Sequence, residues 1–134
     1  MITTYPGYWF DTTSSDMRKL EKTARNDNAT GKGKSLRCRI CEHVITSENL
    51  RVSIDGYHEH IRSNPHGYEF HFECFQNAPG CSTFGNAIAE DSWFHGYKWQ
   101  IAICGGCGEH LGWLFRGNSD FYGLISARLM REGE

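Results

Sequence analysis

Cys104-Gly105-Gly106-Cys107 repeats the spacing of an earlier stretch, Cys38-Arg39-Ile40-Cys41. A C-x-x-C turn presents two thiolates on one side, and two such turns supply the four soft ligands that zinc takes in a tetrahedron. The 62 residues between the two pairs exceed the spacing of about 15–20 in compact zinc ribbons, so one metal would close a long loop. These four cysteines are predicted to hold one structural Zn²⁺ per chain: Cys38, Cys41, Cys104 and Cys107.

The cellular compartment decides between two interpretations of these pairs. A reducing compartment favours metal binding, whereas an oxidising one makes two small disulfides the rival. The first sixteen residues show no basic start followed by an apolar stretch, so no signal peptide is visible and a cytoplasmic protein is expected. No apolar run approaches the roughly 18 residues that cross a bilayer.

Composition and charge are those of one soluble domain. The 134 residues include 14 Lys and Arg against 16 Asp and Glu, for a net charge of −2. An acidic domain has no electrostatic attraction to phosphates, so we expect neither nucleic acid nor a membrane as partner. We expect a monomer.

Residues 35–134 are predicted to form a mainly β domain, because short alternating segments are separated by turn residues. The predicted strands are 36–40, 51–54, 68–74, 97–103, 111–116 and 121–129. The stretch 77–86, with Pro79 and Gly80, is a predicted loop. Residues 1–34 are polar and form a predicted arm or linker, in which a short helix would run from Ser15 to about Arg25.

Three of the four tryptophans, Trp93, Trp99 and Trp113, lie within 21 residues around the second cysteine pair. A turn at His95-Gly96 would bring their segments together. Three converging indoles make a cage for a flat neutral ring or for an organic cation, the latter helped by Glu90-Asp91. Clustered tryptophans also pack ordinary cores, and spacing alone leaves both interpretations open.

Six short motifs are more informative together than singly, because their order and spacing agree with one known pattern. They are, in chain order, residues 38–41, 64–68, 91–99, 104–107, 110–115 and 121–124. Together they resemble the CULT domain, the thalidomide-binding domain of cereblon, which also occurs as a stand-alone protein. The resemblance covers about residues 36–129, which is most of the chain.

This resemblance implies a β-tent, in which two antiparallel sheets meet and are pinned by one four-cysteine zinc site. It also implies a pocket for cyclic imides, such as glutarimide or the imides at damaged protein C-termini, or for uracil-like rings. Main-chain groups of Asp91 and Trp93 would hold the imide edge. The implied ligand-binding residues are Asn64, Pro65, Asp91, Ser92, Trp93, Trp99, Trp113 and Phe115.

Some features depart from the family pattern. Asp91 and His95 stand where cereblon has His and Pro, and Cys81 has no counterpart. The protease-like domain of cereblon and its adaptor-docking segment do not fit in 134 residues, so a ubiquitin-ligase role is not carried over.

Two other functions stay open from the sequence. One is an aromatic-cage reader of quaternary ammonium or methyl-lysine. The other is an enzyme like the B-type methionine sulfoxide reductases, which need a reactive cysteine outside the metal site. Cys74 falls in an alternating strand and Cys81, in the predicted loop, is the one candidate thiol. We therefore expect a binding module and no catalysis. His58 and His60, beside Glu59, are expected on the surface or in strand packing.

Overall fold

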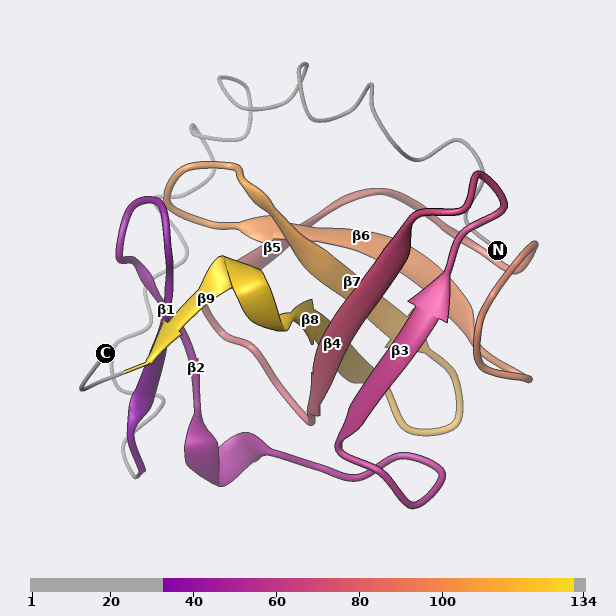
Figure 1. Cartoon of the computed structure of the whole chain (residues 1–134), viewed down its shortest axis with the longest axis horizontal. Helices are drawn as coiled ribbons and strands as arrows, with labels where there is room; N and C mark the ends of the chain where they lie inside the picture. Colours follow the sequence, from indigo (N-terminus) through magenta and orange to yellow (C-terminus); the bar gives the residue numbers. More distant parts are fainter. Residues whose placement is uncertain (1–32, 132–134) are drawn as a thin grey trace.

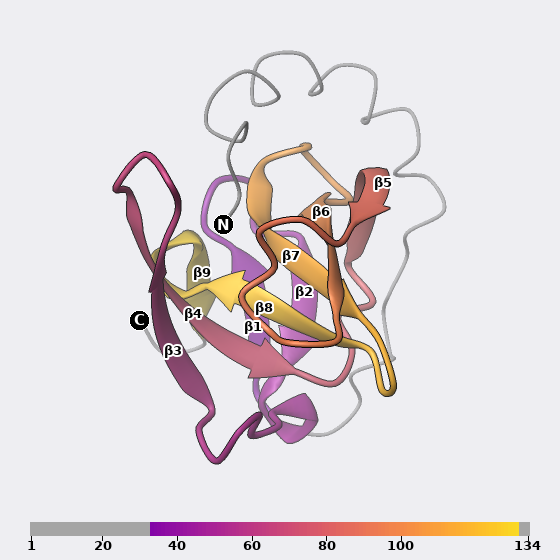
Figure 2. The ribbon, with the colours of Figure 1, turned by 90° about the vertical axis from the view of Figure 1, so that its right-hand side faces the viewer.

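The computed structural model describes residues 33–131; most of the predicted arm, including its helix, lies outside that range. Two antiparallel sheets build the domain, one with the strand order β2-β1-β9 and one with the order β3-β4-β8-β7-β6-β5. The small sheet lies at one end of the molecule, on the left of Figure 1. Figure 2 shows the larger sheet from β3 on the left to β5 on the right. The predicted mainly β fold with two antiparallel sheets is confirmed.

The strands are short, as the sequence suggested. The three-stranded sheet contains β1 (Ser35–Cys38), β2 (Val44–Ser47) and β9 (Leu129–Arg131). The six-stranded sheet contains β3 (Glu59–Ser63), β4 (Glu69–Phe75), β5 (Cys81–Ile88), β6 (Lys98–Cys104), β7 (His110–Arg116) and β8 (Phe121–Ile125). Two 3₁₀ turns, η3 (Glu48–Leu50) and η4 (Ser126–Arg128), precede Arg51 and β9. Within the described range, no helix is long and apolar enough to cross a membrane.

The main core lies on one face of the β6–β7 hairpin. Trp99 pairs with Phe115 and Ile101 pairs with Trp113 across the two strands. Because side chains alternate between the faces of a strand, these four share one face. Each is at most 5 % exposed. The alternation seen along residues 97–103 therefore places two of the three clustered tryptophans on the same side of the sheet.

An ion pair with a buried carboxylate joins the two sheets. Glu73 of β4 accepts hydrogen bonds from Arg131 of β9 at 2.5 Å and from Ser126 of η4 at 2.8 Å. His58 lies 3.3 Å from the same carboxylate. Burial raises the pKa of Glu73, but these hydrogen bonds outweigh it and hold the pKa below its ordinary value. The carboxylate is therefore charged at neutral pH and links one sheet to the other.

The predicted strand 51–54 is wrong. This segment makes only isolated bridges, Arg51 with Phe75 and Ile54 with Tyr57. Residues 69–73 of β4 are already paired with β3. Only Cys74 and Phe75, at the end of β4, remain to pair with the 51–54 segment. The chain then reverses at Asp55-Gly56, as its turn residues indicated, with φ values of 53° and 89°.

The predicted loop 77–86 is also wrong, because its second half forms the edge strand β5. Backbone pairing with β6 overrides the local turn signals, and only residues 77–80 remain a connection. Gly85, with φ of 82°, lies at the register shift between Phe84 and Ile88, where a bulge accommodates it. Cys81 is consequently a strand residue. The strand β2 was not predicted.

Candidate metal centre and tryptophan cluster

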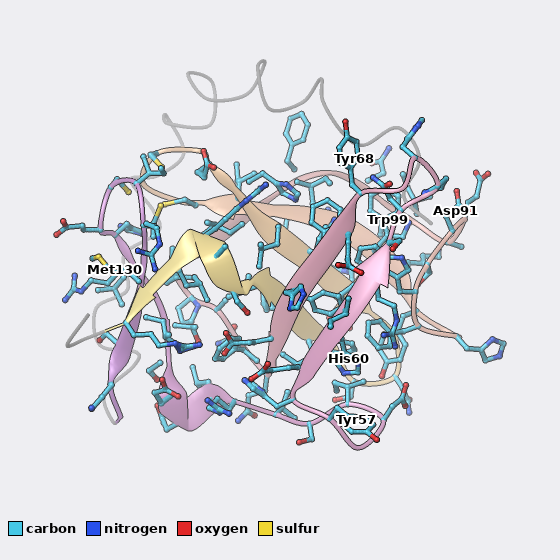
Figure 3. All side chains as sticks on the ribbon, viewed as in Figure 1. Tyr57, His60, Tyr68, Asp91, Trp99 and Met130 are labelled. Atoms are coloured by element: carbon cyan, nitrogen blue, oxygen red, sulfur yellow. The ribbon has the colours of Figure 1, made fainter. Side chains whose placement is uncertain are left out.

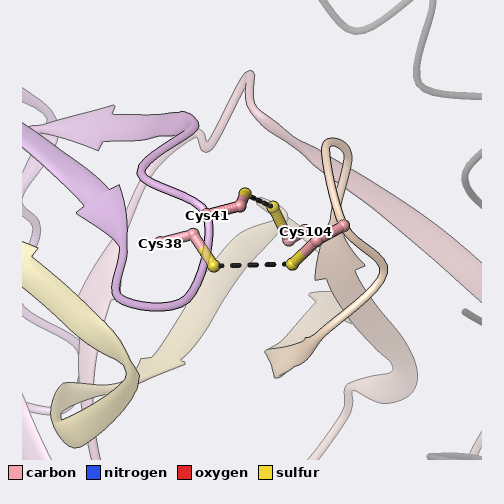
Figure 4. Close-up of side chains that lie close together, drawn as sticks. Cys38, Cys41 and Cys104 are labelled. Carbon is pink, nitrogen blue, oxygen red and sulfur yellow. Dashed lines mark hydrogen bonds between the residues drawn. The ribbon is translucent and has the colours of Figure 1, made fainter.

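The two C-x-x-C turns bring their four sulfur atoms together. All four Sγ atoms lie within 4.8 Å of one another. The Sγ–Sγ distances are 3.8 Å between Cys38 and Cys107 and 3.6 Å between Cys41 and Cys104 (Figure 4). Tetrahedral zinc with Zn–S bonds of about 2.3 Å separates its sulfurs by about 3.8 Å, whereas a disulfide needs about 2.05 Å. The cluster could hold one metal ion, and all four cysteines are free thiols in the structure.

The two turns share one backbone geometry. In each, the N–H of the first cysteine, Cys38 or Cys104, donates to the carbonyl five residues later, at 2.9 and 2.8 Å. The N–H four residues after that cysteine donates back to its carbonyl, at 2.8 and 2.9 Å. The residue there has positive φ in both turns, 67° at Glu42 and 82° at Gly108. In the second turn the Gly106 N–H also donates to the Cys104 sulfur at 3.2 Å, which favours a thiolate.

The cluster joins the two sheets and its thiols are electrostatically coupled. Cys38 ends β1 in the small sheet, and Cys104 ends β6 in the large one. Hydrogen bonds from Cys104 and Cys107 lower the pKa of Cys38. Hydrogen bonding to Cys107 and Cys38, together with burial, raises the pKa of Cys104. Four thiolates this close repel one another, so full ionisation requires a cation among them.

The structure brings two of the three predicted cage tryptophans into direct contact. Trp93 meets Trp113 edge to face, with ring centroids 5.0 Å apart and an interplanar angle of 81°. Trp93 is half-buried and stacks on Phe72 at 5.5 Å. Trp99 lies on the same sheet face as Trp113, toward the Asp91 loop (Figure 3). Phe115 is fully buried beside Trp113, with centroids 6.5 Å apart.

The loop that carries Trp93 is fixed by the indole groups themselves. The Trp99 indole N–H donates to the Glu90 carbonyl at 2.8 Å, which ties the loop to β6. The Trp93 indole N–H donates to the Ser63 carbonyl at 3.2 Å, which ties it to β3. Asp91 has φ of 62°, a left-handed conformation that Asp tolerates better than most residues. The indole groups of Trp99 and Trp93 therefore anchor this loop to β6 and β3.

Ser92 and Pro65 serve turns near the cluster. The Ser92 hydroxyl lies 3.1 Å from the Phe94 carbonyl and 3.3 Å from its N–H, so it shapes the turn after Trp93. Pro65 is exposed in the β3–β4 turn, directly after Asn64. Neither side chain belongs to the buried aromatic cluster.

Two hydrogen-bond donors beside the cluster have no acceptor in the described part of the chain. Asn64 is 4 % exposed, and its Oδ1 accepts from the His66 and Tyr68 N–H groups at 2.9 Å each. Its Nδ2 is buried without a hydrogen-bond partner. The Trp93 main-chain N–H likewise has no acceptor within residues 33–131. Since Trp93 is bonded to Ser63, next to Asn64, both donors lie in one neighbourhood.

The two remaining cysteines lie in strands, Cys74 in β4 and Cys81 in β5. Cys74 is fully buried, and burial raises the pKa of its thiol to about 12. Burial also raises the pKa of Cys81, which lies opposite Cys104 in the β5–β6 register. Neither is an activated thiolate near neutral pH. His60, 6 % exposed, stacks on Phe72 and is a core residue.

These two sheets and the cysteine cluster between them define, in the part of the chain that the structure describes, a β domain with a candidate metal-binding centre. No family model matches the chain. The chain is similar to cereblon from Gallus gallus, 34% identical over 105 residues that cover 72% of this chain and 23% of cereblon. Cereblon from Xenopus tropicalis is 44% identical over 84 residues, and cereblon from Danio rerio 37% over 83, each covering 60% of this chain and 19% of cereblon. The chain thus spans about a fifth of the length of these relatives. It carries a cereblon-like domain of the CULT type.

Proposed function

We propose that the cysteine cluster holds one structural zinc ion and that the tryptophan cluster binds a neutral ring with an imide or uracil-like edge. Zinc is favoured over other metals because four thiolates in a tetrahedron suit its ligand preference. All four ligands come from the protein, so no position is left for a substrate. The zinc would stabilise the fold, and binding would take place at the tryptophans.

The observation that carries the ligand proposal is the pair of donors beside the indoles. A buried donor without a partner costs about 1–3 kcal/mol, so Asn64 Nδ2 is expected to meet an acceptor in the functional state, and the Trp93 N–H is a second donor that can serve the same ligand. The carbonyl oxygens of an imide would supply that acceptor. The imide N–H would in turn donate to a main-chain carbonyl near Asp91, while the faces of Trp93 and Trp99 would cover the ring.

The same donors argue against the cation-cage alternative. Quaternary ammonium and trimethyl-lysine present no acceptor, so Asn64 Nδ2 and the Trp93 N–H would stay unpaired. Glu90 and Asp91 supply the negative charge that a cation would require, which is why ligand charge is varied in the test below.

Binding without catalysis is also proposed. The reductase alternative requires a low-pKa cysteine outside the metal site. The pKa values of Cys74 and Cys81 are both raised by burial. Neither thiol is suited to attack a substrate near neutral pH.

A tryptophan-fluorescence titration tests the proposal. Glutarimide should quench indole emission, with an affinity near micromolar at best because the ligand has few atoms. N-methylglutarimide should bind at least about tenfold more weakly, because methylation removes the imide donor and leaves a buried carbonyl unpaired. Equal binding of the two rings, or preferential binding of a trimethylammonium compound, would refute the imide-reading mechanism.

The matched variant is Asn64→Asp, which keeps the oxygen that accepts from the turn and removes the Nδ2 donor. It should weaken glutarimide by about 1–3 kcal/mol, roughly tenfold or more, while circular dichroism stays unchanged. Trp99→Ala should cost about 2 kcal/mol of binding, as expected for a central aromatic anchor. Tyr57→Ala removes an aromatic that is 68% exposed and outside the cluster, so its binding should match the unmodified protein.

A further inference from the structure

A fifth cysteine lies beside the four-cysteine cluster. Cys81, the first residue of the edge strand β5, pairs in register with Cys104, the last residue of β6. Residues directly opposite each other on antiparallel strands present their side chains on the same face. Cys81 also packs against the second core cluster, which contains Cys38 and Cys104. Five thiols therefore lie together in the described part of the chain, and Cys81 is the one outside the proposed metal-binding set.

The backbone hydrogen bonds give this pair the geometry of a cross-strand disulfide. The Gly105 N–H donates to the Gly80 carbonyl at 2.8 Å, while the N–H groups of Cys81 and Cys104 donate to other residues. Cys81 and Cys104 are therefore a non-hydrogen-bonded pair, in which the Cα atoms lie about 4.5 Å apart and the side chains approach most closely. A disulfide takes Cα separations of about 4.4–6.8 Å, so these two sulfurs can bond after side-chain rotation without a large movement of the backbone.

The two sulfurs have complementary chemistry. A cysteine that binds a metal does so as the thiolate, which is also the form that peroxide oxidises. The Gly106 N–H donates to the Cys104 sulfur at 3.2 Å and supports that charge. Cys81 is a free thiol. Cys104 is buried, whereas Cys81 is partly exposed on the edge strand, so a small oxidant can reach the pair from the edge of the sheet.

Cys81 is better placed for oxidation with Cys104 than the other cysteines of the cluster. In a metal-loaded cluster, a disulfide between two ligands requires both of them to leave the metal. A disulfide with Cys81 requires only Cys104 to leave. The three cysteines that remain are fewer than the four ligands of a structural zinc site, so the affinity for zinc falls once this bond has formed.

We propose that Cys81 and Cys104 form a site of reversible oxidative modification, at which hydrogen peroxide joins them in a cross-strand disulfide and removes one ligand from the cysteine cluster. The Cys104 thiolate attacks the peroxide, whose O–O bond breaks to give the Cys104 sulfenic acid and hydroxide. The Cys81 thiol then attacks the same sulfur. The S–S bond forms, the S–O bond breaks, and the hydroxyl group leaves as water with the Cys81 proton. The two sulfurs lose two electrons, which reduce the peroxide. Zinc release rests on the proposed function, whereas the disulfide itself does not.

Peptide mapping of the peroxide-treated protein tests this pair. The zinc content of the reduced protein is measured first, and zinc release during treatment is followed with a colorimetric chelator. Chymotrypsin cleavage after Phe75 separates Cys74 from Cys81, and tandem mass spectrometry distinguishes Cys104 from Cys107 as the partner. The expected product is the Cys81–Cys104 disulfide, which forms in step with zinc release. Dithiothreitol should reverse the bond and restore zinc binding.

Two alanine variants separate this pair from general oxidation. Cys81→Ala keeps all four proposed ligands, so it should bind zinc like the unmodified protein and release it at least about fivefold more slowly in the same peroxide. Cys74→Ala removes a cysteine of the other core cluster and should release zinc at the unmodified rate. Disulfides confined to the four cluster cysteines, or equal release rates in the two variants, would overturn the proposal. A reduced protein without zinc would refute the zinc centre, and the peptide map alone would then decide whether the pair forms.

Discussion

Gly112 lies where β7 approaches β8 too closely for any side chain. A Cβ at this position would lie 2.0 Å from the Gly123 carbonyl oxygen and 2.9 Å from the Leu124 Cα, where ordinary contact begins at 3.4 Å. The atoms in the way are main chain, so only a separation of the two strands relieves the clash. Gly112→Ala should therefore lower the free energy of unfolding by about 3 kcal/mol or more, a large part of the 5–15 kcal/mol typical of a domain.

Two other glycines provide graded comparisons. A Cβ on Gly123 would meet ring atoms of Phe72 at 2.8 Å and Phe115 at 3.0 Å, and these rings can shift only slightly because both are fully buried. Gly123→Ala should cost about 1–3 kcal/mol. Gly56 has φ of 89° with nothing within 4 Å, so Gly56→Ala should cost only the backbone strain of about 1–2 kcal/mol.

Urea unfolding, followed by tryptophan emission at constant zinc, measures all three variants. The urea concentration at the unfolding midpoint should be highest for Gly56→Ala, lower for Gly123→Ala and lowest for Gly112→Ala. The slopes of the three transitions should be similar. Gly112 also precedes Trp113, so strand separation should weaken glutarimide binding in Gly112→Ala and leave it intact in Gly56→Ala. If Gly112→Ala were as stable as Gly56→Ala, the conclusion that β7 and β8 approach too closely for a side chain at position 112 would be refuted.

Three further predictions concern metal, pH and the arm. Metal analysis should find about one zinc per chain, and Cys104→Ser should lose it and unfold or aggregate, because metal binding contributes to folding free energy; a folded, metal-free protein by mass spectrometry and circular dichroism would contradict this. Denaturation midpoints should fall with acid in two stages. Burial lowers the pKa of His110, so the contribution of this residue to folding stability is present above about pH 6.5 and lost below it. Burial alone would raise the pKa of Glu73, but Arg131 above all lowers it. The contribution of Glu73 to folding stability is therefore lost below about pH 4.5. Stability that was flat from pH 7 to pH 4 would contradict the first stage. Removing residues 1–32 should leave glutarimide affinity nearly unchanged, since no proposed ligand-binding residue lies there, and a tenfold loss would make the arm part of the site.

The cysteine cluster was predictable because its geometry follows from local chemistry. A C-x-x-C turn constrains two sulfurs whatever the rest of the fold does, so the spacing at Cys38–Cys41 and Cys104–Cys107 sufficed. The strands β4 and β6 were predictable for a similar reason, since large apolar residues alternate with other residues along each of them. The sequence left the role of the tryptophans open, because the same spacing suits a core and a cage.

The missed features depend on long-range pairing. Residues 81–88 contain turn-forming Gly85, yet they form β5 because β6 offers them a partner edge. Asn64 was assigned by resemblance only, and its unpaired Nδ2 emerges from the way its Oδ1 is used in the β3–β4 turn.

The cysteine cluster and the tryptophan cluster are connected through β6 and β7. Cys104 ends β6 five residues after Trp99, and β7 begins three residues after Cys107 and carries Trp113. The second cysteine turn therefore sets the register in which the two indoles share a face. A slip of one residue would move one of them to the opposite face. The register of the β6–β7 pair already shifts between Ala102 and Ile103. A metal bound at the end of this hairpin would prevent a further slip of the two strands. The zinc would thus determine the shape of the ligand site without touching the ligand.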